Sequence, residues 1–391
     1  MDYDKILSDR VKKLKWSGIR KFFDIASTVE NVISLSLGEP DFKTPWNIRK
    51  EAIRTLEKGK TTYTSNAGLQ QLKDSIAGYL KTQFHLEYNS HNEVVVTVGG
   101  SEAIDLSFRS ILNPGDEVLV VEPSFVCYSP LVEMAGGVPV IVKTRLENNF
   151  KLVPEDFEHL ITPKTKAIVL PFPNNPTGAV MRLPDLEKVA AVLRNTEIMV
   201  ISDEIYAELT YGDEKHVSIA ELDGMKDRTI IASGFSKAFS MTGWRLGYLA
   251  GPEPIITQML KIHQYGIMCA PTVSQYAAIT ALTECRKDVQ SMKEEYDRRR
   301  RLVVKGFNDL GLPTFEAEGA FYVFPCIKRL GMSSQDFCQK LISEKKVAVV
   351  PGDAFGESGE GYFRVSYAYS LTHLTAAMER IGEFLDENGL R

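Results

Sequence analysis

Short apolar runs alternate with amphipathic stretches along the middle of this chain. Residues 93–98 are rich in valine and predict a strand, and a helical pattern follows at 101–112. Residues 113–116, Asn-Pro-Gly-Asp, indicate a turn before the next strand at 117–121. Five more strands are predicted, at 138–142, 166–170, 198–201, 229–232 and 247–250. Strands separated by helical patterns indicate βαβ units, so we predict an α/β fold whose mostly parallel, seven-stranded sheet is flanked by helices.

Near Pro252 the pattern changes to helices and shorter strands. The predicted elements are helices at 253–265, 272–284 and 287–310, strands at 320–324, 347–350 and 362–367, and two closing helices. This order indicates a smaller α+β domain, which the N-terminal arm joins and the long helix connects to the sheet. We therefore predict a large domain of residues 40–280 and a small domain of residues 1–39 and 281–391.

Composition and charge exclude several classes of protein. The 391 residues carry a formal net charge of −5, which lacks the basic surplus of a nucleic-acid-binding protein. The basic run Arg298–Arg301 follows Glu294 and Glu295 at helical spacing, so we interpret it as a solvated face with ion pairs. No apolar run is long enough to span a membrane, and the charged N-terminus lacks a signal core.

The cysteines indicate neither a metal site nor a disulfide framework. There are five of them, an odd number, and they lie far apart without any Cys-x-x-Cys pair. We expect a cytoplasmic protein without a metal, whose thiols mostly fill core positions.

The segment 233–247 is the most informative for chemistry, because it contains Lys237. This lysine follows the apolar run 229–233, which predicts a buried strand, and serines, glycines and Arg245 lie near it. A lysine amine is a useful nucleophile where its charge is disfavoured, and this position suits an imine to a phosphorylated aldehyde. A strand-end lysine near the surface is the alternative. The first interpretation predicts a pyridoxal 5′-phosphate (PLP) enzyme.

A phosphate site is predicted at residues 99–103, Gly-Gly-Ser-Glu-Ala, between a strand and a helix. Glycines let the backbone approach the ligand, and a helix N-terminus favours an anion. Ser101 would donate its hydroxyl, and Glu102 and Ala103 their backbone N–H groups. An ordinary N-cap by Ser101 is the alternative.

Asp203 follows an apolar strand, where a carboxylate is costly unless it is paired. A protonated pyridine nitrogen is a suitable partner, and Tyr206 could donate to the phenolic oxygen of the same ring. The alternative is a helix-capping Asp203 with Tyr206 in the core.

Two further positions could complete the ring site. Asn175 lies in a proline-rich loop after another strand, and its amide could contact both a cofactor oxygen and a substrate carboxylate. Phe125 follows the strand at 117–121 and could stack on the pyridine ring. A rigid turn and a plain core aromatic are the respective alternatives.

Arg364 interrupts an apolar strand near the end of the chain. A buried arginine needs a partner, and its planar fork matches a carboxylate such as that of a substrate. An ion pair within the protein is the alternative.

Together these pieces resemble the class I/II (fold-type I) PLP-dependent aminotransferases over essentially the whole chain. The matching segments are 34–42, 63–69, 175–178, 203–206, 236–237, 243–245 and 363–367. Any one of them is a modest signal, whereas seven in the right order are specific. The segments 19–24, 263–265 and 295–300 resemble most the archaeal-type aromatic amino acid aminotransferases and their bacterial relatives.

The resemblance implies a role for each candidate residue. Lys237 would form the Schiff base and shuttle the proton, Asp203 would pair with the ring nitrogen, and Phe125 would stack on the ring. Tyr206 and Asn175 would contact its phenolic oxygen. The implied phosphate ligands are Ser101, Glu102, Ala103, Ser236 and Arg245, with Tyr63 from a neighbouring subunit, and the implied substrate-carboxylate ligands are Arg364, Gly38 and Asn175.

This chain departs from the family pattern at one position near the lysine, and the same resemblance implies an oligomeric state. Many members carry a serine or threonine three residues before the lysine, where this chain has Gly234, so Ser233 or Ser236 must substitute. Because Tyr63 would serve the partner's site, a homodimer is implied.

The implied activity is a ping-pong transamination. An L-amino acid, with aromatic side chains favoured, would give its amino group to 2-oxoglutarate. Aspartate and N-acetyl-diaminopimelate are the alternative substrates, and a C–S β-lyase of the same fold is the nearest competing enzyme. A ligand-sensing module is disfavoured, because the family motifs start by residue 34 and leave no room for an N-terminal DNA-binding domain. From the resemblance we also expect the segment through Phe23 to move over the site.

Overall fold

A seven-stranded sheet forms the centre of the computed structural model, which describes residues 1–16, 18–19 and 29–390. Strand β8 is antiparallel to both of its neighbours, and the other pairs are parallel. In spatial order the strands are β2 (Val94–Thr97), β8 (Gly247–Ala250), β7 (Thr229–Gly234), β6 (Met199–Asp203), β5 (Thr165–Leu170), β3 (Glu117–Glu122) and β4 (Val138–Lys143). The prediction of a mostly parallel α/β sheet is confirmed, and each predicted strand begins and ends within two residues of the observed one.

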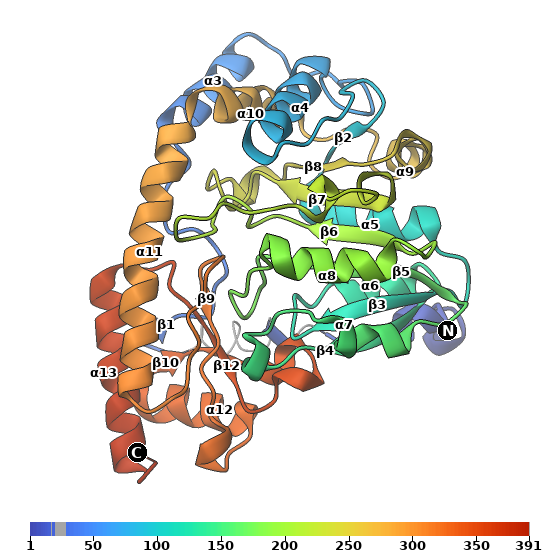
Figure 1. Ribbon diagram of the computed structural model, residues 1–391. Coiled ribbons are helices and arrows are strands. Elements are labelled where there is room, and N and C mark those ends of the chain that lie inside the picture. The colour runs from blue at the N-terminus through green and yellow to red at the C-terminus, as the bar shows by residue number, and fades with distance from the viewer. Residues whose placement is uncertain (17, 20–28, 391) are drawn as a thin grey trace.

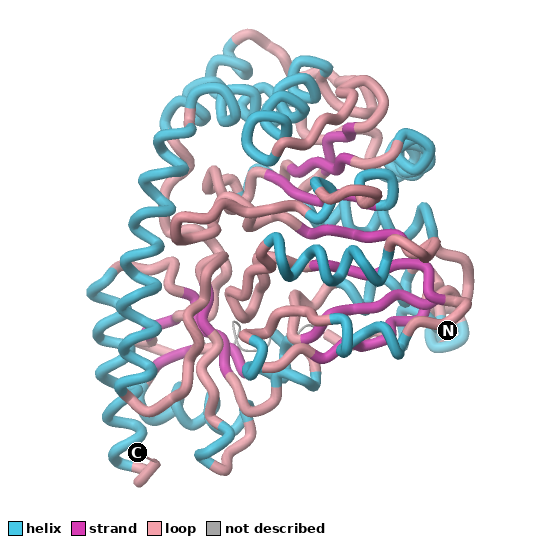
Figure 2. Tube along the Cα trace, in the orientation of Figure 1, coloured by secondary structure: helices cyan, strands magenta, loops and turns pink. Residues whose placement is uncertain are grey.

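Helices cover both faces of this sheet (Figures 1 and 2). Successive residues of a strand point to opposite faces. Leu119 and Val121 accordingly pack in the cluster that contains α8 (Leu183–Leu193). Val118 and Val120 pack with residues of α5 (Gly100–Ile111), α6 (Tyr128–Met134) and α9 (Glu253–Gly266). Burial on both faces explains why these strands have nearly continuous apolar sequences.

The remaining elements lie at the two ends of the sheet. Helices α3 (Trp46–Glu57), α4 (Gln70–Phe84) and α10 (Thr272–Glu284) pack together beyond β2 (Figure 1). The short helices α1 (Asp9–Lys13) and α7 (Pro154–Phe157) lie near the β4 end. Among the described helices, none combines the length and the apolar composition needed to cross a membrane.

The second part of the chain forms a smaller α+β unit beside the sheet. The long helix α11 (Arg286–Asp309) runs along one side of the molecule and packs against α13 (Leu371–Glu387) (Figure 1). An antiparallel sheet joins β11 (Val350–Pro351), β12 (Phe363–Ser366) and β9 (Tyr322–Val323), in that order. Strand β1 (Ile33–Ser34) pairs in parallel with β10 (Val347–Ala348). This pairing joins an N-terminal segment to the C-terminal unit, and the division into residues 40–280 and residues 1–39 with 281–391 stays a prediction.

Two expectations about this part are corrected. Of the two helices expected to close the chain, α12 (Ser334–Lys345) precedes β10, and only α13 follows the last strand. The run Arg298–Arg301 is not a wholly solvated face, because Arg299 and Arg300 are each only 6% exposed. Arg299 pairs with Asp41 at 2.8 Å as well as with Glu295 at 3.0 Å, so it ties α11 to the N-terminal segment. The expected movement of the segment through Phe23 stays a prediction, and residues 17 and 20–23 of that segment lie outside the described ranges.

Candidate active site

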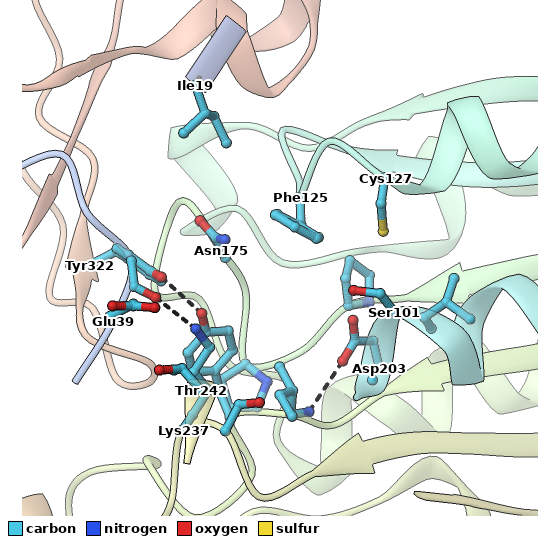
Figure 3. A pocket seen from close by; sticks show the side chains of 18 of the residues that line it. Ile19, Glu39, Ser101, Phe125, Cys127, Asn175, Asp203, Lys237, Thr242 and Tyr322 are labelled. Carbon is cyan, nitrogen blue, oxygen red and sulfur yellow. Dashed lines mark hydrogen bonds between the residues drawn. The ribbon is translucent and has the colours of Figure 1, made fainter. Parts of the chain in front are cut away.

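A cavity of about 510 Å³ opens where the parallel strands end (Figure 3). Ligands of open α/β sheets bind at this edge, because the loops that follow the strands converge there. The cavity brings together ten of the predicted residues: Gly38, Ser101, Phe125, Asn175, Asp203, Tyr206, Ser236, Lys237, Arg245 and Arg364. The side chains of Glu102, Ala103 and Tyr63 do not line it.

Lys237 lies three residues after the end of β7, in a turn, with its amine pointing into the cavity. Its Nζ donates to the carbonyl oxygen of Gly38 at 2.6 Å. Burial lowers its pKa to about 8, while Glu39 opposes the shift and Arg364 adds to it. A lowered pKa leaves more of the amine neutral, which is the form that attacks a carbonyl. Its position in the cavity and its lowered pKa therefore suit a nucleophile better than a strand-end charge at the surface.

Asp203 ends β6 and presents its carboxylate to the same cavity. Its Oδ2 accepts from the Tyr128 hydroxyl at 2.7 Å, and its Oδ1 accepts from the Ile205 N–H at 3.2 Å. Burial raises the pKa of this carboxyl, and the Tyr128 hydrogen bond opposes the rise. A cationic partner in the cavity would hold it ionised. The helix-cap alternative is wrong, because residues 204–210 form turns rather than a helix.

Sequence reasoning missed Tyr128, which holds Asp203. It is the first residue of α6 and lies three positions after Phe125, whose ring it meets edge-on at 6.4 Å. Only the spacing from Phe125 could have pointed to it. Phe125 itself projects over the cavity (Figure 3).

The end of the cavity near α5 is a cradle for an anion. Gly99, with φ of 78°, is the N-cap residue of α5, so Ser101 stands in the first helical turn and its N-cap alternative is wrong. The first N–H groups of a helix have no partner within the helix and attract anions. A Cβ at Gly99 would lie 2.6 Å from Nη2 of Arg245, which places this guanidinium against the glycine turn.

The positions of the two serines near Lys237 favour Ser236 as the candidate phosphate ligand. Ser236 lines the cavity, whereas the Ser233 hydroxyl donates to the carbonyl oxygen of Glu204 at 3.2 Å. Gly234 leaves no room for a hydroxyl side chain, because a Cβ there would lie 2.9 Å from Cα of Gly247. A larger residue would push apart β7 and β8.

Glu102 and Ala103 belong to this cradle through their backbone alone. The side chain of Glu102 turns away and accepts from the Val98 N–H and from Nδ1 of His263, the latter at 2.7 Å. His263 comes from α9 and is fully buried. Sequence reasoning missed this contact, which fastens the first turn of α5 to a helix 160 residues away in the sequence.

Arg364 lies at the opposite end of the cavity and is only 2% exposed. Its Nη1 donates to Oδ1 of Asn175 at 2.9 Å and its Nη2 to the Ser36 carbonyl oxygen at 2.6 Å. The rings of Tyr322 and Phe355 flank it at 4.5 and 4.8 Å. Its Nε is buried without a partner, and burial lowers the pKa of the guanidinium.

The expected alternative for Arg364, an ion pair within the protein, is wrong for the residues that the structure describes. Both of its bonded partners are neutral oxygens. A buried cation without an acidic partner is costly, so an incoming carboxylate would be strongly favoured. Because Oδ1 of Asn175 faces Arg364, its Nδ2 remains as a donor toward the cavity.

Tyr206 and Tyr63 lie in contrasting environments. Tyr206 is 5% exposed, and its hydroxyl lies 2.8 Å from the hydroxyl of Tyr322. Tyr63 is 79% exposed and contributes nothing to the cavity of its own chain. The structure thus brings together every predicted ring and substrate contact, and leaves Tyr63 on the surface.

The residues of this cavity fit PLP. A lysine amine with a lowered pKa, a carboxylate at a strand end and an aromatic ring surround one space. A helix N-terminus and Arg245 form the anion cradle at one end. The cradle requires a glycine at position 99, because a Cβ there would collide with the Arg245 guanidinium. These are the donors that an aldehyde, a pyridine nitrogen and a phosphate require.

Comparison with known proteins gives a consistent result. The family model "Aminotransferase class I and II" matches residues 30–381. A putative aminotransferase of Bacillus subtilis, YugH, is 52% identical and covers 97% of this chain and 98% of its own length. An aspartate aminotransferase from Pyrococcus abyssi is 47% identical over 98% of this chain and 99% of its own. The solved aromatic aminotransferase from Pyrococcus horikoshii is 45% identical with a TM-score of 0.91, and the match covers 95% of this chain and all of that one.

Proposed function

Since the chain belongs to the class I and II aminotransferases, which use pyridoxal 5′-phosphate, we propose that it moves the amino group of an aromatic L-amino acid to 2-oxoglutarate by a ping-pong mechanism. The observation that carries the substrate preference is the set of charges in the cavity. Its described lining holds three cations, Lys237, Arg245 and Arg364. The cofactor aldehyde, its phosphate and the substrate α-carboxylate would use one each.

No cation of the described lining remains for a second carboxylate on the amino donor. The region beyond the ring position is bordered by Phe125 and Ile19, and Glu39 adds a negative charge at the cavity. A neutral, flat side chain would bury apolar surface there without leaving a charge unpaired. This favours phenylalanine or tyrosine over aspartate.

Each protein group would act at a definite atom. When bound, the cofactor supplies an aldehyde that condenses with amines and a ring that accepts the electron pair left on the α-carbon. Lys237 would remove the proton from the α-carbon and deliver it to C4′ of the cofactor, the carbon on the other side of the amino nitrogen. Asp203 would keep a proton on the ring nitrogen, and Arg364 would hold the substrate carboxylate so that the α-carbon faces Lys237.

A homodimer completes this proposal. Tyr63, Tyr265, Met268 and Trp46 are large apolar residues that are between 46% and 88% exposed. Asn66 donates to the Met268 carbonyl oxygen at 2.8 Å, so the Tyr63 segment and the end of α9 form one surface. A surface of this kind favours burial against another protein. A second copy would cover it and carry Tyr63 to the neighbouring cavity.

The test is a panel of amino donors with 2-oxoglutarate, ranked by kcat/KM. We expect phenylalanine and tyrosine to exceed aspartate, and Lys237→Ala to lose the visible cofactor absorbance and nearly all turnover. Preference for aspartate or N-acetyl-diaminopimelate would replace the aromatic assignment with the corresponding alternative. Pyruvate and ammonia released from cystathionine without an acceptor acid would identify a C–S β-lyase instead.

A further inference from the structure

Tyr322 connects the two ends of the reaction centre. It lies on β9, in the smaller α+β unit, and its side chain reaches into the cavity while remaining only 1% exposed (Figure 3). It contacts one residue proposed to bind the substrate and one proposed to bind the cofactor. Neither composition nor local pattern singled it out.

The ring of Tyr322 supports Arg364. The guanidinium carbon lies 4.5 Å from the ring centroid, and Phe355 flanks it at 4.8 Å. A cation held over an aromatic face away from water is stabilised by the ring's quadrupole. The ring also fixes the plane of the guanidinium, and therefore the direction in which it presents its free N–H groups.

The hydroxyl of Tyr322 serves a different neighbour. It lies 2.8 Å from the hydroxyl of Tyr206. It also abuts Gly38, where any Cβ would overlap it, and the Gly38 carbonyl oxygen accepts from the amine of Lys237. One hydroxyl thus borders both the tyrosine that faces the phenolic oxygen and the loop that receives the resting lysine.

The direction of the tyrosine pair follows from hydrogen-bond accounting. A hydroxyl has a single proton to donate. If Tyr206 donates to the phenolic oxygen of the cofactor, the proton between the two tyrosines must come from Tyr322. A hydroxyl that accepts one hydrogen bond donates a stronger one, because each bond polarises the next.

We propose that Tyr322 is a positioning residue with two separable functions: its ring orients Arg364 for the substrate carboxylate, and its hydroxyl orients Tyr206 toward the cofactor's phenolic oxygen. The inference rests on the roles proposed above for Arg364 and Tyr206. Since Tyr322 stands on β9 and Tyr206 follows β6, this contact also couples the two parts of the fold at the reacting atoms.

Two variants separate the functions. Tyr322→Phe removes only the hydroxyl, and Tyr322→Leu removes the ring as well. Tyr367→Phe is the matched control, because Tyr367 is equally buried and its hydroxyl donates to the Ala320 carbonyl oxygen at 3.1 Å, outside the cavity. Each cofactor-loaded protein is titrated by visible absorbance against pH, and its affinity for the unreactive carboxylate 3-phenylpropionate is measured by calorimetry.

Tyr322→Phe is expected to raise the pH midpoint of the absorbance change by roughly 0.2–0.5 units. Without the Tyr322 hydroxyl, Tyr206 donates a weaker hydrogen bond, so the phenolic oxygen of the cofactor keeps more negative charge and the titrating proton is held more tightly. Its kcat falls and its affinity for 3-phenylpropionate stays within twofold. Tyr322→Leu shares the shift and also weakens that affinity roughly 5- to 30-fold. Tyr367→Phe changes neither quantity.

If Tyr322→Phe kept the absorbance midpoint of the unmodified protein, the function proposed for the hydroxyl would be wrong. If Tyr322→Leu kept the affinity of the unmodified protein for 3-phenylpropionate, the function proposed for the ring would be wrong. Both outcomes leave the proposed transamination untouched. The proposed function fails separately, if the unmodified protein shows no cofactor absorbance or does not bind the carboxylate.

Discussion

The two ends of the cavity are built in opposite ways. The proposed phosphate cradle is built on one strand-to-helix turn, residues 99–103, to which the segment after β7 adds Ser236 and Arg245, and its polar groups Ser101 and Arg245 are exposed. The carboxylate end consists of Arg364, Asn175 and Ser36, which come from three distant segments and are each less than 10% exposed. The phosphate end is therefore open to water and centred on one turn, whereas the carboxylate end is buried and assembled entirely from distant segments.

This difference sets what each end can tolerate. Water and counterions replace part of a lost contact at an exposed site, whereas a lost contact inside the protein leaves its partner unpaired. We therefore expect substitutions at the carboxylate end to reduce activity strongly, and we expect that added cofactor does not restore it. Changes at the phosphate end should be milder and should be overcome by added cofactor.

Arg364→Leu should have the largest effect. It removes a buried charge that alone would pair with the substrate carboxylate, and such losses cost about 3–4 kcal/mol, or on the order of 10²–10³ in kcat/KM. The cofactor should still bind. Steady-state kinetics over a wide substrate range and visible absorbance of the same sample measure both quantities.

Arg182→Leu is the control for Arg364→Leu. Arg182 is also partly buried, but it pairs with Glu318 outside the cavity. If the Arg364 variant kept kcat/KM within about tenfold of the unmodified protein, the carboxylate end would not depend on this cation, and the comparison between the two ends would fail.

The same contrast explains how much of the site could be predicted from the sequence. The strands, the glycine turn and Lys237 follow from local patterns, because a parallel strand and the turn after it are contiguous in the chain. Tyr128, His263 and Tyr322 were missed, since each acts on a residue more than 70 positions away. Nothing within a local window distinguishes them from core aromatics or a core histidine.

The burial of Arg299 and Arg300 was mispredicted for a related reason. Helical spacing from Glu294 and Glu295 correctly indicated ion pairs on α11, and Arg299 does pair with Glu295. It could not show that Asp41 and Glu316 would approach from other segments and bury the same side chains. Which face of a helix is covered depends on the fold around it.

Lys237 lies between the two ends. Its replacement should have the next largest effect, which is a change in how the free energy of unfolding depends on pH. Its pKa is lowered to about 8 in the folded cofactor-free protein, against about 10.4 in an unfolded chain. Between these values the unfolded state binds more protons, so unfolding becomes less favourable as the pH rises from 8 toward 10.4. Below pH 8 the destabilisation is complete, at about 3 kcal/mol or less.

Lys237→Met should therefore be more stable than the unmodified apoprotein at pH 7.5, and its advantage should shrink as the pH approaches 10. Thermal unfolding of both proteins across this range measures the difference. Lys261→Met is the control, because Lys261 is an exposed lysine on α9 that should show no such trend. An advantage that stays constant with pH would mean that Lys237 titrates normally.

Arg245→Ala tests the milder end. Loss of one charged hydrogen-bond partner at an exposed phosphate site should raise the dissociation constant of the cofactor roughly 10- to 100-fold. With cofactor in excess, kcat should return to within a few-fold of normal. Equilibrium dialysis of the apoprotein and assays at increasing cofactor concentration follow the two quantities, and Arg194→Ala, at a surface ion pair with Glu187, is the control.

The smallest effect concerns the contact between His263 and Glu102, which fastens the first turn of the phosphate cradle to α9. His263→Leu leaves the carboxylate without its buried donor, which should destabilise the protein by about 1–3 kcal/mol and weaken cofactor binding a few-fold through the first turn of α5. His263→Asn keeps a nitrogen donor near the position of Nδ1 and should restore most of both. Unfolding in urea and cofactor titration of the apoproteins give the two values. Unaltered cofactor affinity in His263→Leu would mean that the turn at residues 99–103 keeps its shape without this contact. A loss as large as that of Arg245→Ala would mean that the phosphate end depends on buried tertiary contacts as the carboxylate end does, and the comparison would fail.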